Sequence, residues 1–327
     1  MIRLWEDLKD WAYRKKITIV RRSFLVVVFV LLNSILFGMF SFGRHPYLRY
    51  VLLPNASCRY IDNAPTYCYF YSLQNWLTGG FSSFYQELFI PLLVIGVLII
   101  ALGRWWCSWA CPFGLMQEIL MSIRSLLKIP HIQLSYKWIA ILDQGKYAIL
   151  FFTILIAVAI GIPYMGLPTN LLLDIPLYGD RVVNLALPFC QICPAKGFFT
   201  LLQMMLGLIP VNMLPPIAIA MLVLFMVGSF FIRMFWCRLC PMGAVMALFN
   251  RQSLFWLRKK PSRCTKCRIC LRVCPQDYSQ VYEEMERQNI TGPECTLCGR
   301  CVESCPEKEA LSYNILNFTI YKSKPKR

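Results

Sequence analysis

Sixteen of the 327 residues are cysteines, whereas the chain has only two histidines. Two runs near the carboxyl terminus, CTKCRICLRVCP at 264–275 and CTLCGRCVESCP at 295–306, contain eight of these cysteines. Both have the spacing C-x2-C-x2-C-x3-C-P, in which three thiolates surround one [4Fe–4S] cube and the fourth cysteine ligates the neighbouring cube. The predicted ligand sets are Cys264, Cys267, Cys270 and Cys305 for one cluster, and Cys295, Cys298, Cys301 and Cys274 for the other. Zinc is the alternative metal for such thiolates.

Two shorter cysteine motifs resemble each other, RWWCSWACPFG at 104–114 and RMFWCRLCPMG at 233–243. Each follows an apolar run and continues through proline and glycine, which help a loop to turn tightly. Each pair is half of the ligand set that a four-iron cube needs. Together, Cys107, Cys111, Cys237 and Cys240 predict a third cluster at the inner membrane face. The alternative is that they are unliganded, small core residues.

The remaining cysteines complete an internal repeat. Cys58 and Cys68 precede YFYSLQ, and Cys190 and Cys193 precede the similar stretch PAKGFFTLLQ. Each half of the chain therefore has an apolar run, a cysteine pair, a second apolar run and one of the two motifs above, in the same order. These two motifs, at 104–114 and 233–243, are called the first and second CP motifs, after their Cys-Pro dipeptide. Parallel repeats of this kind are related by an axis along the membrane normal. Cys58, Cys68, Cys190 and Cys193 predict a fourth cluster at the outer face; disulfides or a thiol–disulfide relay are the alternatives in an oxidising compartment.

Composition and charge indicate a membrane protein. The chain is 57% hydrophobic with a mean hydropathy of +0.51, and its uncharged runs are at 24–43, 88–103, 147–173 and 197–232. Such runs predict about four spans of a hydrocarbon core of ~30 Å. The formal charge of +17 is concentrated before the first run, between the second and third, and after the last. This distribution predicts cytoplasmic termini in the inner, cytoplasmic membrane, and does not favour nucleic-acid binding.

The VRRSFL segment at 20–25 resembles a twin-arginine export signal, but no small-residue cleavage site follows it, which favours a retained span. Two short apolar segments, 69–81 and 197–209, are predicted to form half-helices. We therefore expect a mainly α protein: a polytopic helical bundle of two parallel pseudo-repeats with a carboxyl-terminal α+β ferredoxin-like domain. The predicted domains are a basic cytoplasmic segment (1–23), membrane repeat 1 (24–135), membrane repeat 2 (136–260), and a cytoplasmic two-cluster ferredoxin domain with a basic tail (261–327).

The two carboxyl-terminal runs resemble the two-cluster bacterial ferredoxins over about 45 residues. Over almost the whole chain, the paired CP motifs, the four spans and the double ferredoxin runs resemble the NapH/MauN-type polyferredoxin membrane proteins. The second motif departs from that family's C-x3-C-P spacing, because it reads C-x2-C-P. The resemblance implies electron transfer between a membrane quinone pool and partner redox proteins.

The expected function is that of an integral membrane iron–sulfur subunit, which carries electrons across or out of the membrane to or from a partner redox protein. Its expected partners are other redox subunits of a membrane complex, membrane lipid and a quinone. The alternative is a quinol dehydrogenase subunit that oxidises quinol at the cytoplasmic face, with the outer cysteines as disulfides. Candidate quinone-site residues are Arg104, Trp105, Trp106, Trp109 and Glu118. No catalytic residue is expected, since a four-iron cube exchanges electrons without forming bonds to a substrate.

Overall fold

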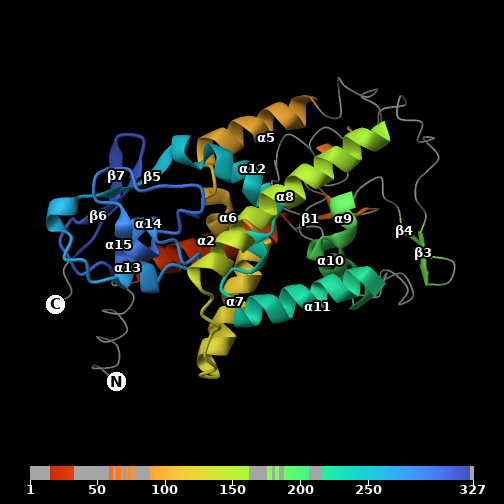
Figure 1. Ribbon diagram of the computed structural model, residues 1–327, viewed down its shortest axis with the longest axis horizontal. Coiled ribbons are helices and arrows are strands. Elements are labelled where there is room, and N and C mark those ends of the chain that lie inside the picture. Colours follow the sequence, from red (N-terminus) through yellow and green to blue (C-terminus); the bar gives the residue numbers. More distant parts are fainter. Residues whose placement is uncertain are drawn as a thin grey trace. The chain divides into compact units, whose positions relative to one another are not determined.

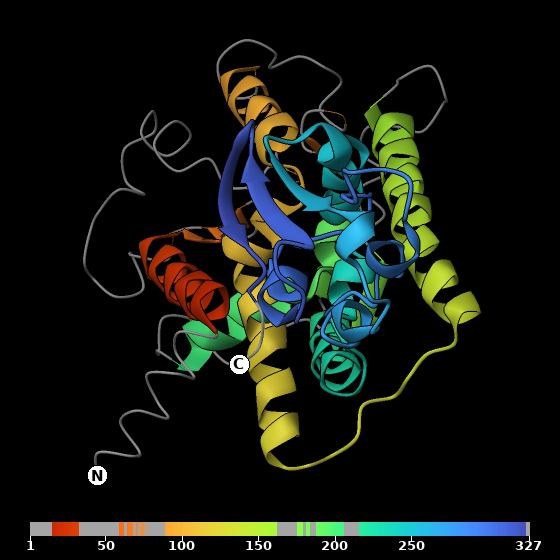
Figure 2. The ribbon, with the colours of Figure 1, turned by 90° about the vertical axis from the view of Figure 1, so that its left-hand side faces the viewer.

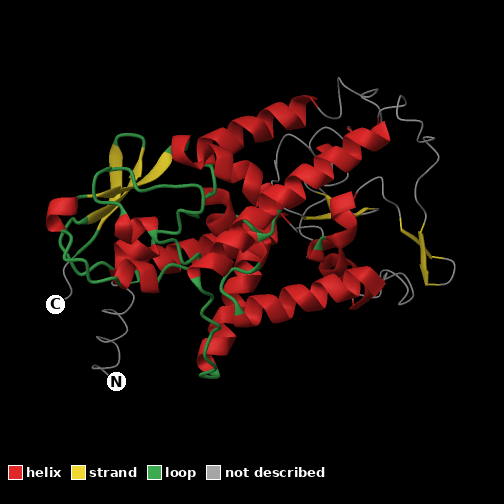
Figure 3. Ribbon diagram, viewed as in Figure 1, coloured by secondary structure: helices red, strands yellow, loops and turns green. Residues whose placement is uncertain are grey.

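A computed structural model describes residues 15–32, 59–61, 64–67, 70, 73–74, 77, 89–161, 175–178, 181–183, 188–205 and 216–324. Helices are the predominant secondary structure of these residues, with strands confined to a three-stranded sheet and two short hairpins (Figures 1 and 3). The chain divides into two compact units that are interleaved along the sequence. The first unit comprises Met1–Phe29, Leu98–Leu115 and Val245–Arg327, and the second comprises Val30–Val97 and Met116–Ala244.

The carboxyl-terminal part of the first unit is built around an antiparallel sheet in the order β5-β6-β7 (Figure 2). In β5–β6 the register pairs Phe255 with Ile315 and Lys259 with Leu311. The elements are β5 (Phe255–Lys259), η5 (Pro261–Arg263), α13 (Ile269–Arg272), α14 (Gln280–Glu283), α15 (Arg300–Ser304), β6 (Leu311–Ile315) and β7 (Phe318–Lys322). This end of the chain therefore combines short helices with a small sheet, whereas the predicted boundaries of a separate domain stay a prediction.

Three further elements of the first unit come from distant parts of the chain. They are most of α2 (Lys16–Leu32), α6 (Trp105–Trp109), and the end of α12 (Pro241–Phe249) with the turn η4 (Asn250–Gln252). Backbone hydrogen bonds also join the end of another helix to the sheet: Leu254 N–H donates to the Ala101 carbonyl, and Leu316 N–H donates to the Leu254 carbonyl. The last turn of α5 (Phe89–Leu102) is thereby connected to the tip of the β6–β7 hairpin.

The second unit is helical apart from two hairpins. Its helical elements are α7 (Pro112–Leu126), α8 (Tyr136–Gly161), α9 (Pro188–Ile192), α10 (Pro194–Met205), α11 (Pro216–Phe231) and the turn η3 (Trp236–Arg238). The hairpins are β1 (Arg59–Ile61) with β2 (Ala64–Tyr67), and β3 (Ile175–Tyr178) with β4 (Arg181–Val183). The segment 197–209 is predicted to form a half-helix, and its described residues, 197–205, lie in the amphipathic helix α10.

One described helix is long and apolar enough to cross a membrane. Residues Tyr136–Val158 of α8 have a mean hydropathy of 1.7 over their most apolar window, only 11% of which is buried. Two shorter apolar helices, Leu93–Leu102 and Pro216–Phe231, fall in two of the other predicted spans. The first predicted span continues beyond α2 into residues outside the described ranges. The bundle of four full spans therefore remains a prediction.

The close approach of α10 to α11 depends on a glycine. A Cβ atom on Gly197 would lie 2.6 Å from the Ala218 carbonyl oxygen, a backbone atom that cannot move aside. Gly197→Ala is therefore expected to separate these helices and to cost about 1–3 kcal/mol, the usual range for overpacking. The measurement is the thermal unfolding midpoint of the purified protein in detergent.

The matched control is Gly96→Ala on α5, since a Cβ there would meet no atom within 4 Å. It should leave the unfolding midpoint unchanged or raise it slightly, because alanine has the higher helix propensity. Equal midpoints for the two variants would contradict the assigned α10–α11 contact.

Candidate iron–sulfur sites

The two carboxyl-terminal cysteine runs share an unusual backbone conformation. Lys266 and Arg268 in the first run have φ angles of 55° and 60°, and Leu297 and Gly299 have 53° and 73° at the equivalent positions of the second. Left-handed residues that alternate with ordinary ones turn successive backbone N–H groups towards one point, a nest that binds anions and iron–sulfur clusters. Three of the four are not glycine, and such strain is typical of functional sites. The backbone of both runs therefore fits a cluster.

The ligand set predicted for the first ferredoxin site is Cys264, Cys267, Cys270 and Cys305. All four cysteines line one cavity, although Cys305 lies in the second run. Burial raises the pKa of Cys305, and the facing Cys267 and Cys264 raise it further. Cys267 is exposed to solvent. The structure thus places together the four residues predicted for this cluster, at the surface of the first unit.

The ligand set predicted for the second ferredoxin site is Cys295, Cys298, Cys301 and Cys274. The first three are buried. Burial raises the pKa of Cys274 to about 12, and the facing Cys298, from the other run, contributes to this shift. Burial also raises the pKa of Cys295, with smaller contributions from Cys298 and Cys274. Thiols that are this unfavourable to ionise alone need a bound cation to be stable as thiolates.

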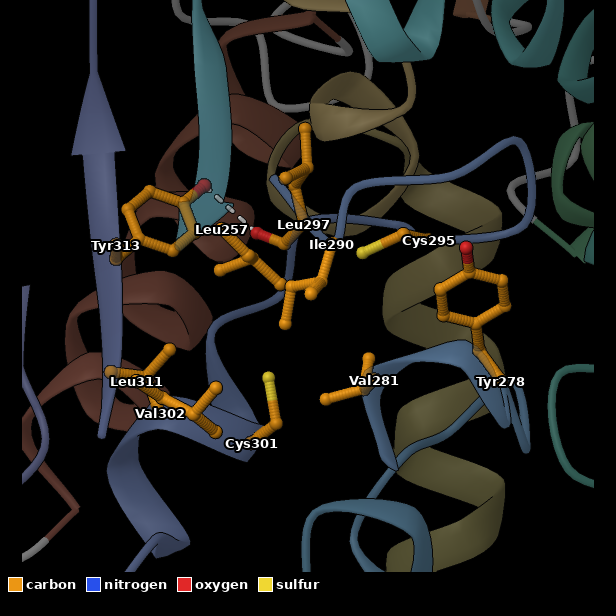
Figure 4. Packing of buried hydrophobic residues seen from close by; sticks show 10 residues of the cluster. All are labelled: Leu257, Tyr278, Val281, Ile290, Cys295, Leu297, Cys301, Val302, Leu311 and Tyr313. Carbon is orange, nitrogen blue, oxygen red and sulfur yellow. Dashed lines mark hydrogen bonds between the residues drawn. The ribbon is translucent and has the colours of Figure 1, made fainter. Parts of the chain in front are cut away.

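Apolar side chains surround the second site. The sulfurs of Cys295 and Cys301 point into a cluster that includes Val281, Ile290 and Val302 (Figure 4). Low polarity and the exclusion of water are among the factors that set the potential of a bound cluster. Within the described ranges, no three His, Cys, Asp or Glu side chains are spaced for a single metal ion. A four-iron cube needs a wider spacing, since each cysteine binds a different iron.

The segment 292–297, here called the second cysteine loop, directs its carbonyl oxygens towards donors from other elements. Ser108 Oγ on α6 donates to the Thr296 carbonyl at 2.7 Å. The Leu297 carbonyl accepts the indole N–H of Trp109 at 3.1 Å and the hydroxyl of Tyr313 at 2.9 Å. A nest turns its N–H groups to one side, so its buried carbonyls must be satisfied on the other. The first CP motif provides two of these hydrogen-bond donors, Ser108 and Trp109. Ser108 directly follows Cys107 in the sequence.

Asn250 and Arg104 donate hydrogen bonds to the other carbonyl groups of this loop. Asn250 Nδ2 donates to the carbonyls of Gly292 (2.6 Å) and Cys295 (2.7 Å), while its Oδ1 accepts the backbone N–H of Arg104 at 2.8 Å. The guanidinium of Arg104 is fully buried. It donates to the Pro293 carbonyl at 3.1 Å and to the Glu294 carboxylate at 2.7 Å. Arg104, predicted as a quinone-site candidate, therefore organises this loop, and the role of Asn250 had no sequence signal.

Helix α2 also contacts this region. Arg21 Nη1 donates to the Ser108 carbonyl at 3.0 Å, and Thr18 hydrogen-bonds through its N–H and hydroxyl to the Glu303 carboxylate on α15. Arg21 is completely buried. In the sequence, Arg21 is one of the two arginines of the twin-arginine resemblance and one of the basic residues that predict a cytoplasmic amino terminus. In the structure it fixes the backbone of α6 one residue from Cys107.

In the second unit, a buried glutamine contacts Cys237. Gln117 Nε2, on α7, donates to Cys237 Sγ at 3.2 Å, and its Oε1 accepts the backbone N–H of Trp236 at 3.0 Å. Arg238, the neighbour of Cys237, is buried and pairs with Asp143 at 3.3 Å. In the first unit, Met246 Sδ lies 3.5 Å from Cys107 Sγ.

The described members of the predicted outer set have a similar environment. Gln74 Nε2 donates to Cys190 Sγ at 3.4 Å, and its Oε1 accepts the Phe189 N–H at 3.0 Å. Cys190 and Cys193 are both half-buried. Cys58 and Cys68 lie outside the described residues, so the complete set stays a prediction.

Two aromatic rings lie between the Cys190 and Cys237 environments. Phe189 and Trp236, each directly before one of these cysteines, stack with ring centroids 6.4 Å apart. The segments that carry these two cysteines are therefore in contact.

Two family models match the chain. A 4Fe-4S binding domain matches residues 85–130 and 214–264, which contain the two CP motifs. A 4Fe-4S dicluster domain matches residues 257–306, which contain the two ferredoxin runs. No solved structure matches the chain significantly.

Several characterised and uncharacterised proteins are similar in sequence. The uncharacterized protein MJ0750 of Methanocaldococcus jannaschii is 28% identical over 226 residues, which are 68% of this chain and 77% of that protein. The regulatory protein NosR of Pseudomonas aeruginosa is 28% identical over 83% of this chain and 35% of its own length. The putative electron transport protein YccM of Escherichia coli is 30% identical over 61% of this chain and 49% of its own length.

The chain thus spans about half of YccM and about a third of NosR. Because four-iron cubes exchange single electrons, the two domain matches identify an iron–sulfur protein of the electron-transfer class. The narrower NapH/MauN resemblance stays a prediction.

Asn250→Ala tests the organisation of the second cysteine loop. It removes the donor to the Gly292 and Cys295 carbonyls, and each buried group left unpaired costs about 1–3 kcal/mol. We expect a lower unfolding midpoint and less iron per chain, measured on anaerobically purified protein.

The control is Gln252→Ala, in the same turn but exposed, which should change neither quantity. If Asn250→Ala keeps the wild-type iron content and midpoint, the loop does not depend on this side chain.

Proposed function

We propose that the protein is an integral subunit of the cytoplasmic membrane that transfers electrons through four [4Fe–4S] clusters to or from a partner redox protein. Two clusters would be bound at the two ferredoxin sites. The others would be bound by Cys107, Cys111, Cys237 and Cys240, and by Cys58, Cys68, Cys190 and Cys193. The termini would lie in the cytoplasm. Bound clusters supply one-electron chemistry, and the protein supplies their ligands, their spacing and their surroundings.

The observation that carries this proposal is the attachment of α6 to the second cysteine loop. Ser108 and Trp109, next to Cys107, hydrogen-bond to the peptide groups that separate Cys295 from Cys298. A membrane-motif cysteine and a ferredoxin-site cysteine are therefore joined by a short path of covalent and hydrogen bonds. On this path the buried second ferredoxin site comes after the first CP motif. The first ferredoxin site, with its exposed Cys267, lies at the surface. This order suits entry at the membrane motif and exit to a partner at Cys267.

A matched pair of contacts supports the shared inner ligand set. Gln117 and Met246 each lie six residues after the second cysteine of their own motif. Gln117, after the first motif, contacts Cys237 of the second; Met246, after the second motif, contacts Cys107 of the first. This reciprocity indicates that the two motifs are equivalent elements of the internal repeat, and the proposed shared ligand set rests on that equivalence.

The proposal predicts about sixteen irons per chain, at four per cube. Changing both Cys190 and Cys193 to serine should leave about twelve, since serine replaces two thiolates of one cube. Iron and acid-labile sulfide on anaerobically purified protein provide the measurement. About eight irons in the unsubstituted protein would overturn the membrane-domain clusters and leave only the ferredoxin pair.

Electron transfer itself is tested in liposomes that contain the protein, with ferricyanide enclosed and dithionite outside. Transfer across the bilayer should be lost in the Cys190→Ser, Cys193→Ser variant. An unchanged rate in that variant would show that the outer set is not on the path.

A specific observation favours the alternative of quinol oxidation at the cytoplasmic face. The indole N–H of Trp106, directly before Cys107, is buried and has no hydrogen-bond partner among the described residues. A buried donor without a partner costs free energy, and a quinone oxygen is a suitable acceptor. Trp106→Phe should then slow cluster reduction by an added quinol while leaving reduction by dithionite unchanged. Equal effects on both reductants would argue against a quinol contact at Trp106.

A further inference from the structure

Two glutamines in the second unit hold cysteine sulfurs in the same way. The N–H of the residue before the cysteine donates to the glutamine Oε1, and the glutamine Nε2 donates to the cysteine Sγ. At Cys237 the glutamine is Gln117, with distances of 3.0 Å and 3.2 Å. At Cys190 it is Gln74, with distances of 3.0 Å and 3.4 Å. The two sites lie in different parts of the repeat, so the arrangement recurs independently.

The orientation of each amide is fixed by its other partners. A backbone N–H can only donate, so the amide atom that faces Trp236 or Phe189 must be the oxygen. The Ser229 hydroxyl also donates to Gln117 Oε1, at 3.4 Å, and Gln74 Nε2 donates in addition to the Phe70 carbonyl at 3.0 Å. In both cases the NH2 group is left facing the sulfur.

Both glutamines are enclosed by protein. Gln117 is completely buried and Gln74 is 1% exposed. Burying a polar amide is costly unless its groups are hydrogen-bonded. The cysteine sulfur is one of the acceptors that Nε2 uses, and a thiolate is a better acceptor than a thiol. Each amide therefore favours a sulfur that carries negative charge.

Hydrogen bonds to the sulfurs are among the factors that set the potential of an iron–sulfur cluster. Reduction adds one negative charge, part of which resides on the cysteine sulfurs, so an N–H donor stabilises the reduced state more than the oxidised one. In low-polarity surroundings this difference is larger than in water. The surroundings here are the aromatic side chains Phe70, Phe189, Trp236 and Phe225, which contact one another in that order.

We propose that Gln74 and Gln117 donate amide hydrogen bonds to cluster-bound Cys190 and Cys237, and thereby raise the midpoint potentials of the two membrane-domain [4Fe–4S] clusters. This inference rests on the proposed function, in which both cysteines ligate clusters. It adds that two residues outside every cysteine motif control how readily these clusters accept an electron. Because Phe189 and Trp236 stack, the segments that carry Cys190 and Cys237 are in contact. This contact would favour electron exchange between the two clusters.

The internal repeat supplies the substitution to use. At the position equivalent to Gln117 the second half has Met246, which contacts Cys107 without an amide donor. Gln117→Met and Gln74→Met therefore keep a side chain of similar length and remove the N–H group. We expect each to disfavour reduction of its own cluster about tenfold, a fall in midpoint potential of ~59 mV for one electron. Potentiometric titration followed by EPR measures this shift.

Met246→Leu is the matched control, because it changes the residue beside Cys107 without adding or removing an amide donor. Its potentials should equal those of the unsubstituted protein. If Gln117→Met and Gln74→Met retain their iron and show unchanged potentials, the inference is overturned. Iron in the unsubstituted protein reports on the proposed function separately: about eight irons per chain would remove the membrane-domain clusters themselves, whatever the glutamines do.

If a glutamine variant loses iron, its cluster potential cannot be compared with that of the unsubstituted protein. The hydrogen bonds are then tested by a measurement on the unsubstituted protein. With glutamine labelled by ¹⁵N, pulsed EPR of the reduced membrane-domain clusters should show a coupled ¹⁵N nucleus. Its absence, with the clusters present and reduced, would overturn the hydrogen bonds without reference to any variant.

Discussion

The peptide carbonyls of the second cysteine loop impose the constraint on which the first unit depends. The alternating backbone around Leu297 and Gly299 directs N–H groups towards the sulfurs. The carbonyl oxygens are then buried on the outer side, where water cannot satisfy them. Side chains from η4, α6 and β6 provide the donors. Elements that are far apart in sequence are therefore held together by the needs of one short loop.

The same constraint explains the contrast between the two ferredoxin sites. In the first run, residues 265–268 are exposed and Cys264 is half-buried. The second run is covered by α6 and by the apolar cluster around Leu297 and Val302. Two runs with identical cysteine spacing thus have different surroundings, one next to solvent and one next to α6. Clusters in such different environments need not share a potential, since burial and exposure both affect it.

Cysteine spacing predicted much of this arrangement. The exchange of Cys274 and Cys305 between the two runs follows from the C-x2-C-x2-C-x3-C-P pattern, and both cysteines face the opposite run in the structure. The left-handed conformations of Lys266 and Leu297 had no such signal, because glycine, the usual marker, is absent at these positions. Their conformation is imposed by the requirement that three closely spaced thiolates face one point.

Polar residues in apolar surroundings were the hardest to interpret from sequence. Arg21 and Arg104 contributed to a charge count that indicated topology, yet both are completely buried. No sequence pattern singles out Asn250, Gln74 or Gln117. Hydrophobic periodicity reports which face of a helix is buried, but it does not identify the buried carbonyl or sulfur that a particular amide will meet. That information depends on contacts between segments more than one hundred residues apart, such as Gln74 with Cys190.

The hydrogen bonds from α6 to the second cysteine loop also have consequences for the order in which the protein assembles and for its evolution. A ferredoxin-like segment that begins near residue 261 looks like a separable module, but the donors Ser108, Trp109 and Asn250 all precede it in the chain. Iron delivered to this loop before α6 has folded would meet a backbone that is not yet fixed. Assembly of the second site is thus coupled to the folding of the preceding apolar helices. In gene rearrangements, the carboxyl-terminal segment would keep its buried site only if a matching α6 and η4 moved with it.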